Sequence, residues 1–375
     1  VALDGTLPAA GSYPAGRITF TGRTRDGRDL TWRTFRTLQN NGHGKDGEND
    51  MLLDPATLQV RTPWPLYPDA NRPVLDRPAG KVALSLAWPT ASGHHALIID
   101  LPGPGRHDFH VLAARQVIAE VDAQIKARGG VRLAPTVTAD LQRAKRLAAN
   151  PATAATALDA AIASQQALLA STGLALACRS KAPWAVTLTN PSPAAVASAA
   201  DMLAGTPGPK AVRFAFDRAT RPASHAAAVT AAHARGLTVV GEILDSSEMA
   251  SLDAAAWQRR VRDYVAGLPG VDVWEVGNEV NGDWLGRGVR EKVLWAARYV
   301  KQHSRAKTLV TLIWDLGESE RPYSTFTWLA TNLPPAVARD IDEWGLSVYP
   351  EIHPLGTGLG RVLHTLRSRY PAQRL

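Results

Sequence analysis

The sequence predicts a multidomain α/β protein: an N-terminal β-sandwich-like module, a helical spacer, and a (β/α)8 barrel of the TIM type. Three observations predict it, namely strand-like alternation early in the chain, a switch to helical periodicity near residue 111, and a repeated strand-helix unit from residue 182. With 375 residues and 45% hydrophobic side chains, the chain is long enough for more than one core. The predicted boundaries are 1–110, 111–180 and 181–375.

The module over 1–110 is predicted from its alternating pattern. Apolar and small residues alternate over 81–88, a Thr-Ala-Ser-Gly turn follows, and 96–101 returns as a partner strand. Such modules often bind glycans, and we expect this one to be a candidate for that role. From Val111 the period becomes helical, and the alanine-rich segments 138–149 and 152–172 continue it.

Six strand-like segments from residue 182 onward are each followed by a helical pattern. Their starts lie about 26 to 36 residues apart, the spacing of a strand-loop-helix unit rather than of a hairpin. Ser192-Pro193 provides an N-cap and a helix-starting proline. The segments are 184–189, 211–216, 237–243, 271–276, 308–314 and 341–348.

A closed barrel of this type has eight units, so two are missing from the chain. The spacing places a seventh strand at about 374–380, whereas the sequence ends at Leu375. We therefore expect the barrel to be truncated before strand seven.

The segment VDVWEVGNEVNG (271–282) is the most informative in the chain. It reads as a buried strand that delivers Asn278 and Glu279 at its carboxyl end, where parallel barrels keep their chemistry. Glycoside hydrolysis needs a carboxylic acid, a second carboxylate and a partner for the neighbouring hydroxyl. Asn278 and Glu279 could supply two of these three groups.

The GNE motif at the end of a fourth barrel strand resembles the acid/base signature of the clan A glycoside hydrolases. WEVGNEVNG, with WGLSVYPEIHP about seventy residues later, is most similar to the endo-galactanase type. The resemblance covers residues 182–375. It implies a retaining glycosidase with Glu279 as general acid/base, and a nucleophile on the seventh strand, beyond residue 375.

The resemblance also implies further substrate-binding residues. Asn278 would bind the sugar 2-hydroxyl, Arg213 would lie under the nucleophile, and Tyr349 would touch it. Trp284 and Trp314 would stack on sugar faces, although core packing is an equal alternative for Trp314. Trp274 and Trp344 are expected in the core. Glu275 lies one layer deeper than Glu279 and is expected in a buried ion pair, for which Arg213 is a candidate partner.

Two alternatives stay open at this point. One is a glycan-binding protein on a barrel that has lost catalysis, because a fold does not fix a function. The other is an inverting enzyme that uses Glu242, Asp245 or Glu351 as its base. The sequence leaves the sugar and the linkage undetermined.

Composition excludes several classes of function. The net charge is +8, yet no lysine/arginine run interleaves with aromatic residues, so we expect no nucleic-acid partner. No apolar stretch is long enough for a membrane span, and the single cysteine, Cys178, excludes an internal disulfide. We expect no metal or cofactor, a carbohydrate substrate, a monomer when the protein is full length, and a secreted or periplasmic location with the signal peptide removed.

Overall fold

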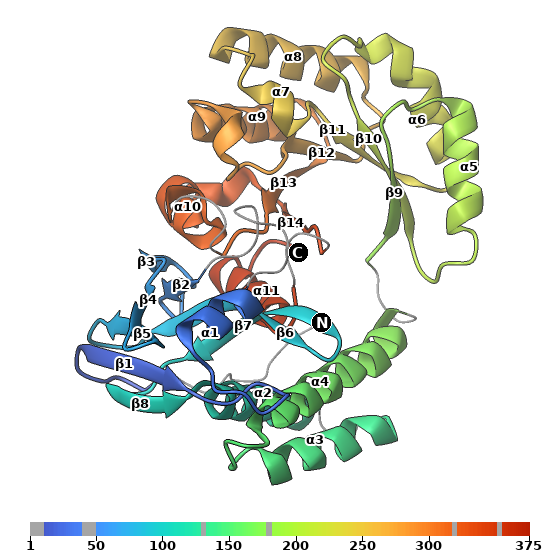
Figure 1. Ribbon diagram of the computed structural model, residues 1–375. Coiled ribbons are helices and arrows are strands. Elements are labelled where there is room, and N and C mark those ends of the chain that lie inside the picture. The colour runs from blue at the N-terminus through green and yellow to red at the C-terminus, as the bar shows by residue number, and fades with distance from the viewer. Residues whose placement is uncertain (1–10, 40–49, 129–132, 178–181, 317–320, 351–354) are drawn as a thin grey trace. The chain divides into compact units, whose positions relative to one another are not determined.

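The computed structural model describes residues 11–39, 50–128, 133–177, 182–316, 321–350 and 355–375. The chain divides into two compact units (Figure 1). Unit 1 comprises Val1–Leu174, Asp315–Thr327 and Val348–Leu366, and unit 2 comprises Ala175–Trp314, Trp328–Ser347 and Arg367–Leu375.

Two four-stranded sheets form the β-rich part of unit 1. One sheet has the order β4-β5-β1-β8 and the other the order β3-β2-β6-β7. The predicted hairpin is confirmed, because β6 and β7 pair antiparallel from Ala83↔Asp100 to Thr90↔Gly93. The strands are β1 (Gly16–Thr21), β2 (Met51–Leu53), β3 (Val60–Pro63), β4 (Leu66–Asp69), β5 (Arg72–Arg77), β6 (Ala83–Thr90), β7 (Gly93–Asp100) and β8 (Gly105–Asp108).

The helices of unit 1 belong to its core rather than to a spacer. Phe109, Val117 and Val121 of α2 are buried in one hydrophobic cluster with Trp88 of β6 and Leu158 of α4. Burying such apolar faces stabilises the unit, so sheets and helices form one packed body. These helices are α1 (Trp32–Gln39), α2 (Phe109–Ala127), α3 (Pro135–Leu147) and α4 (Ala154–Ala177), whose last residues lie in unit 2.

Unit 2 is built on one sheet of six parallel strands, in the order β14-β13-β12-β11-β10-β9. All six predicted strands are confirmed within a few residues. Next to β14, Arg374 forms an isolated parallel bridge with Glu343, where the spacing places the following strand. The strands are β9 (Trp184–Leu188), β10 (Lys210–Ala215), β11 (Thr238–Glu242), β12 (Val273–Gly277), β13 (Lys307–Ile313) and β14 (Glu343–Ser347).

Helices α5, α6, α8 and α9 lie along one face of this sheet (Figure 1). Their starts follow the expected signals: Ser192 caps α5 by accepting a hydrogen bond from Ala195 N at 3.1 Å, and Pro193 is its first residue. The helical elements after β9 are α5 (Pro193–Leu203), η2 (Pro222–His225), α6 (Ala226–His233), α7 (Ser246–Met249), α8 (Ala254–Gly267), η3 (Asp283–Leu285), α9 (Val289–His303), η4 (Arg321–Tyr323), α10 (Thr325–Asn332), η5 (Ala338–Asp340) and α11 (Gly358–Arg369).

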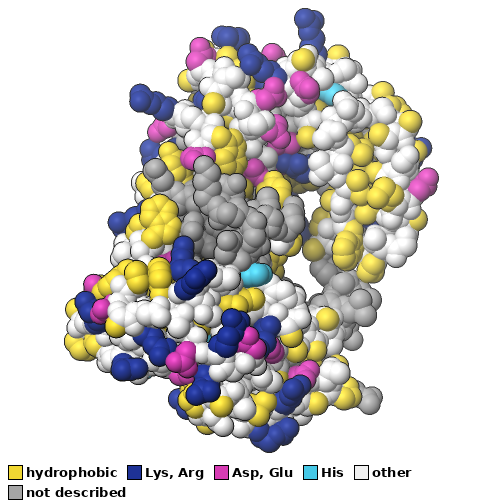
Figure 2. Space-filling view, viewed as in Figure 1, with side chains coloured by type: hydrophobic (Ala, Val, Ile, Leu, Met, Phe, Trp, Pro, Cys, Tyr) yellow, Lys and Arg dark blue, Asp and Glu magenta, His cyan; other side chains and the backbone are white. Residues whose placement is uncertain are grey.

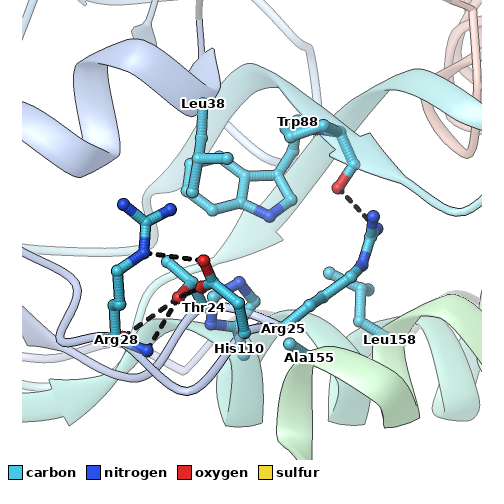
Figure 3. Close-up of a pocket in the computed structure, with 10 residues that line it drawn as sticks. Thr24, Arg25, Arg28, Leu38, Trp88, His110, Ala155 and Leu158 are labelled. Atoms are coloured by element: carbon cyan, nitrogen blue, oxygen red, sulfur yellow. Dashed lines mark hydrogen bonds and ion pairs between the residues drawn. The ribbon is translucent and has the colours of Figure 1, made fainter.

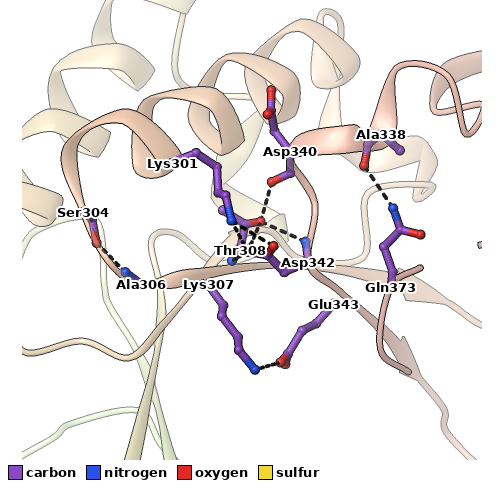
Figure 4. A network of polar contacts seen from close by, with 10 residues as sticks. All are labelled: Lys301, Ser304, Ala306, Lys307, Thr308, Ala338, Asp340, Asp342, Glu343 and Gln373. Atoms are coloured by element: carbon purple, nitrogen blue, oxygen red, sulfur yellow. Dashed lines mark hydrogen bonds and ion pairs between the residues drawn. The ribbon is translucent and has the colours of Figure 1, made fainter.

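The amino ends of β13 and β14 are tied together by a polar network (Figure 4). The Asp342 carboxylate accepts hydrogen bonds from Thr308 N at 2.9 Å and from Lys301 Nζ at 2.9 and 3.0 Å. Lys307 Nζ lies 3.0 Å from Glu343 Oε1. This end of a parallel sheet usually serves stability, and the closed set of bonds fits that role.

Charged side chains of both signs are interspersed on the face shown in Figure 2. Within the described residues, no helix has the length and apolar character that a membrane span requires. The absence of a nucleic-acid partner stays a prediction.

Candidate active site

The candidate site lies at the carboxyl ends of β10, β11, β12 and β13, all within unit 2. Glu242 ends β11 and pairs in register with Glu275 of β12, so two carboxyl groups stand side by side. The side chain of Arg213, on β10, reaches both of them. Parallel-barrel enzymes hold their chemistry at this end of the sheet.

Arg213 and Glu275 form the buried ion pair that the sequence predicts. Arg213 Nε donates to Glu275 Oε2 at 2.6 Å, and Thr311 Oγ1 donates to Glu275 Oε1 at 2.5 Å. Burial by itself would lower the pKa of Arg213, but the Glu275 and Glu242 carboxyl groups outweigh it and raise that pKa. Glu275 is therefore held as a partnered carboxylate beneath the strand ends.

Glu242 is in a different electrostatic position. Arg213 Nη2 lies 3.0 Å from Glu242 Oε2, yet neither Glu242 oxygen has a hydrogen-bond partner among the described residues, and the residue is 1% exposed. Burial, and then the Glu275 charge, raise the pKa of Glu242 to about 8 against the opposing effect of Arg213. Glu242 is thus mostly protonated at pH 7.

Glu279 follows β12 in a strained backbone conformation. Its φ is 50°, in the left-handed region that a glutamate rarely occupies. Ser246 Oγ donates to Glu279 Oε2 at 3.4 Å, and the side chain is buried, with 7% exposure. Such strain persists only where the surrounding contacts fix it, and it is common at functional sites.

Contacts with β13 fix the loop after β12. Val280 N donates to Thr311 O at 3.0 Å, while Asn281 exchanges two hydrogen bonds with Ile313, at 3.1 and 2.8 Å. The loop can pass this close to Gly277 only because glycine has no side chain, since a Cβ there would lie 2.5 Å from Val280 Cγ1. The register of β12 against β13 shifts between Glu275 and Gly277, as in a β-bulge that redirects side chains.

The predicted site residues are only partly brought together. Asn278 is buried next to Glu279, and its Oδ1 has no hydrogen-bond partner among the described residues. Trp284 is 40% exposed on η3, whereas Trp314 is 1% exposed and packs as a core residue. Tyr349 lies in unit 1 and is 38% exposed. Trp274 and Trp344 are buried, as predicted.

Sequence reasoning misses part of the site. It indicates Glu242 only as an alternative base, and it does not single out Thr311, Ser246 or Asn281. A signal exists for Glu242, because Gly241-Glu242 ends its strand as Gly-Asn-Glu ends the next one. Glu351 lies outside the described residues, and among those described no three His, Cys, Asp or Glu side chains are grouped to hold a metal ion.

Comparisons with known proteins do not return the family that the motif suggests. No model of a known protein family matches the chain, and no curated protein matches it. Among similar solved structures are muconate lactonizing enzyme from Pseudomonas putida (16% identity, 78% of this chain and 74% of that chain, TM-score 0.31) and an enolase from Mycobacterium smegmatis complexed with tartrate (14%, 88% and 79%, 0.32). A third is an isomerase from Streptomyces coelicolor (14%, 87% and 85%, 0.32).

The assignment to clan A glycoside hydrolases of the endo-galactanase type is therefore wrong, because these similar structures are titled as a muconate lactonizing enzyme, an enolase and an isomerase. The glycosidase activity and the glycan-binding alternative are withdrawn with it. The physical reason lies in the motif itself. A carboxylate at the end of a parallel strand marks where chemistry occurs in many unrelated enzymes, and it does not specify the reaction.

Proposed function

We propose that the carboxyl end of the unit 2 sheet is an acid–base site that moves protons on a small, neutral, hydroxylated substrate. One observation carries this proposal: the buried Glu242 carboxyl group stands in register beside the partnered carboxylate Glu275, and this burial and neighbouring charge raise the pKa of Glu242 to about 8. Neighbouring carboxyl groups whose environments separate their protonation states are a recurring arrangement in acid–base enzymes.

The charge of the site favours a neutral substrate. The carboxyl groups of Asp245, Glu275 and Glu279 all act electrostatically on Glu242, and Arg213 is the cation that opposes them. An anionic substrate would meet this excess of acidic groups unfavourably. A carbohydrate-like compound is therefore the partner that we propose.

Two polar groups are suited to such a compound. Asn278 Oδ1 is an acceptor without a partner among the described residues, and leaving it unpaired costs about 1–3 kcal/mol. A substrate hydroxyl that donates to it would remove that cost. Glu279, held by its loop and by Ser246, is the candidate base.

The proposed reaction is proton transfer next to a carbonyl group. Glu279 accepts a proton from the carbon beside the carbonyl while Glu242 donates its proton to the carbonyl oxygen, which gives an enediol. Return of a proton to the other carbon, and of a hydroxyl proton to Glu242, gives an isomer. Positioned acid and base groups typically contribute about 10²- to 10⁴-fold each to such a rate.

The proposal is tested by hydrogen–deuterium exchange on the carbon atoms of candidate substrates, and a panel of compounds is used rather than one chosen substrate. The protein is incubated in D₂O with a panel of aldoses, ketoses and hydroxyketones, and proton NMR follows exchange at the carbon beside the carbonyl. We expect protein-dependent exchange for at least one compound, and a loss of about 100-fold or more in Glu242→Gln and in Glu279→Gln.

Glu291→Gln is the matched control, because the Glu291 side chain is 69% exposed on α9. It should exchange at the wild-type rate. Exchange that is absent across the panel, or that survives both site substitutions in folded protein, would exclude the proposed chemistry.

Export to the periplasm or medium and a monomeric state stay predictions. Cell fractionation would test the first. Light scattering on the purified protein would test the second.

A further inference from the structure

A second candidate site lies in unit 1. It is a cavity of about 230 Å³ between the 24–28 turn, the end of β6, and the first turns of α2 and α4 (Figure 3). Its walls are mostly apolar and include Leu38, Trp88, Ala155 and Leu158. An apolar cavity of about 150 Å³ accepts benzene, so this one has room for a substituted ring.

His110 gives the cavity a buried polar group. The residue is 3% exposed, and its Nδ1 has no hydrogen-bond partner among the described residues. Its ring contacts Trp88 edge-on, with centroids 5.5 Å apart. Burial, and then the charge of Arg25, lower the pKa of His110 to about 4, so the imidazole is neutral at pH 7 with one donor and one acceptor nitrogen.

Two arginines line the same cavity, and the protein holds both in place. Arg25 Nη2 donates to Pro89 O at 3.1 Å and to Asp159 Oδ1 at 2.6 Å. Arg28 Nε donates to Asp26 Oδ2 at 2.7 Å. Within the described residues, Nη1 of Arg25 and both Nη groups of Arg28 make no hydrogen bond, which leaves planar donors of the kind that bind carboxylates.

Charged side chains of both signs lie at the cavity. Each arginine forms one ion pair, Arg25 with Asp159 and Arg28 with Asp26, so a bound carboxylate would use the guanidinium nitrogens that these pairs leave without a hydrogen bond. Aromatic and aliphatic walls, a buried imidazole and guanidinium donors together define a small-molecule pocket in which a few polar groups fix the orientation of a ligand.

We propose that this cavity binds a single-ring aromatic acid that carries a ring hydroxyl. The ring lies against Trp88 and Leu158, the carboxylate meets the free guanidinium donors of the arginines, and the hydroxyl bonds to the His110 imidazole. The residues that line the cavity all belong to unit 1, whereas the proton-transfer site is built from residues of unit 2.

The probe is 4-hydroxybenzoate, with affinity measured by isothermal titration calorimetry and contact by saturation-transfer NMR. We expect it to bind at least 5-fold more tightly than benzoate, which lacks the hydroxyl, and than 4-hydroxybenzamide, which lacks the charge. Failure of wild-type protein to bind any of the three would overturn the proposal.

Matched variants locate the binding. Ala155→Leu fills the cavity and should weaken binding at least 10-fold, whereas Ala170→Leu makes the same change at an exposed position of α4 and should leave it unchanged. Equal affinity of these two variants would place the ligand elsewhere.

Two further substitutions assign the polar contacts. Arg28→Gln, at a 73% exposed side chain where unfolding is not expected, should weaken benzoate binding but not amide binding. His110→Phe should abolish the advantage of the hydroxyl while benzoate still binds. If Arg28→Gln still bound 4-hydroxybenzoate more tightly than 4-hydroxybenzamide by the wild-type factor, the contact between Arg28 and the carboxylate would be wrong. If His110→Phe still bound 4-hydroxybenzoate more tightly than benzoate by the wild-type factor, the contact between His110 and the hydroxyl would be wrong.

Discussion

Both ends of the unit 2 sheet carry buried or partly buried polar side chains, but among the described residues these side chains are fully hydrogen-bonded only at the amino end. At the amino end, Asp342 has partners on both oxygens and the network around it is closed (Figure 4). At the carboxyl end, Glu242 and Asn278 bury oxygens that accept no hydrogen bond from the described residues, and Glu279 has a strained backbone. Buried groups without hydrogen bonds and strained backbone lower the stability of the folded protein. Because they are concentrated at the carboxyl end of the sheet, we infer that this end carries the function.

Removing the central cation of the carboxyl end should have the largest effect. In Arg213→Met, Glu275 loses its ion-pair partner and remains buried at 2% exposure. We expect a loss of about 3–5 kcal/mol in the free energy of unfolding, measured by urea denaturation. Adding Glu275→Gln should recover part of this loss. A single-variant loss below about 1 kcal/mol would mean that Arg213 is not the counter-charge of the pair.

The raised pKa of Glu242 predicts a pH dependence with a definite sign. The folded protein keeps this proton up to about pH 8, whereas the unfolded chain releases it near its ordinary pKa of 4.5. Stability should therefore fall as the pH rises from about 4.5 to 8 and become constant above that range. Glu242→Gln removes this loss and should be more stable than wild type by roughly 2–4 kcal/mol at pH 9, with little difference at pH 4.

The measurement for Glu242 is the difference between wild type and variant in urea unfolding from pH 4 to 9. Glu120, buried in unit 1 with a pKa raised to about 7, contributes a similar fall to both proteins and cancels in the difference. A difference that does not grow between pH 5 and 8 would show that Glu242 is ionised in the folded protein.

The amino end should respond in stability alone. In Asp342→Ala, Thr308 N and Lys301 Nζ lose their acceptor, and we expect about 1–3 kcal/mol of destabilisation in urea unfolding. The hydrogen–deuterium exchange activity proposed for the other end should be unchanged. Asp263→Ala, at an exposed position of α8, serves as the control with no expected effect. Loss of exchange in folded Asp342→Ala would remove the contrast between the two ends.

Relief of backbone strain should give the smallest effect and the opposite sign. Glu279→Gly accepts a φ of 50° without cost, so the variant should be more stable by about 0.5–1 kcal/mol while losing exchange activity. Asn71→Gly is the control, because asparagine already tolerates its φ of 59°. Thermal unfolding of both variants checks the prediction, and destabilisation by Glu279→Gly would show that its side-chain contacts outweigh the strain.

Local patterns in the sequence were sufficient for part of the strands and helices. The six strands of unit 2, the 83–100 hairpin and the Ser192 cap depend on side chains close in sequence, and each was predicted from the residues. The pairing of Glu275 with Arg213 was also accessible, because a carboxylate one layer below a strand end requires a partner.

The sequence by itself thus determined which segments of unit 2 form strands and which carboxylates stand near their ends. Only the tertiary structure decided that Glu242 lies beside Glu275, that helices α2, α3 and α4 contribute to the core of the β-rich unit, and that His110 and Arg25 line one cavity. The reason is physical: propensity and periodicity act over a few residues, whereas register, burial and the resulting pKa shifts depend on segments brought together from distant parts of the chain.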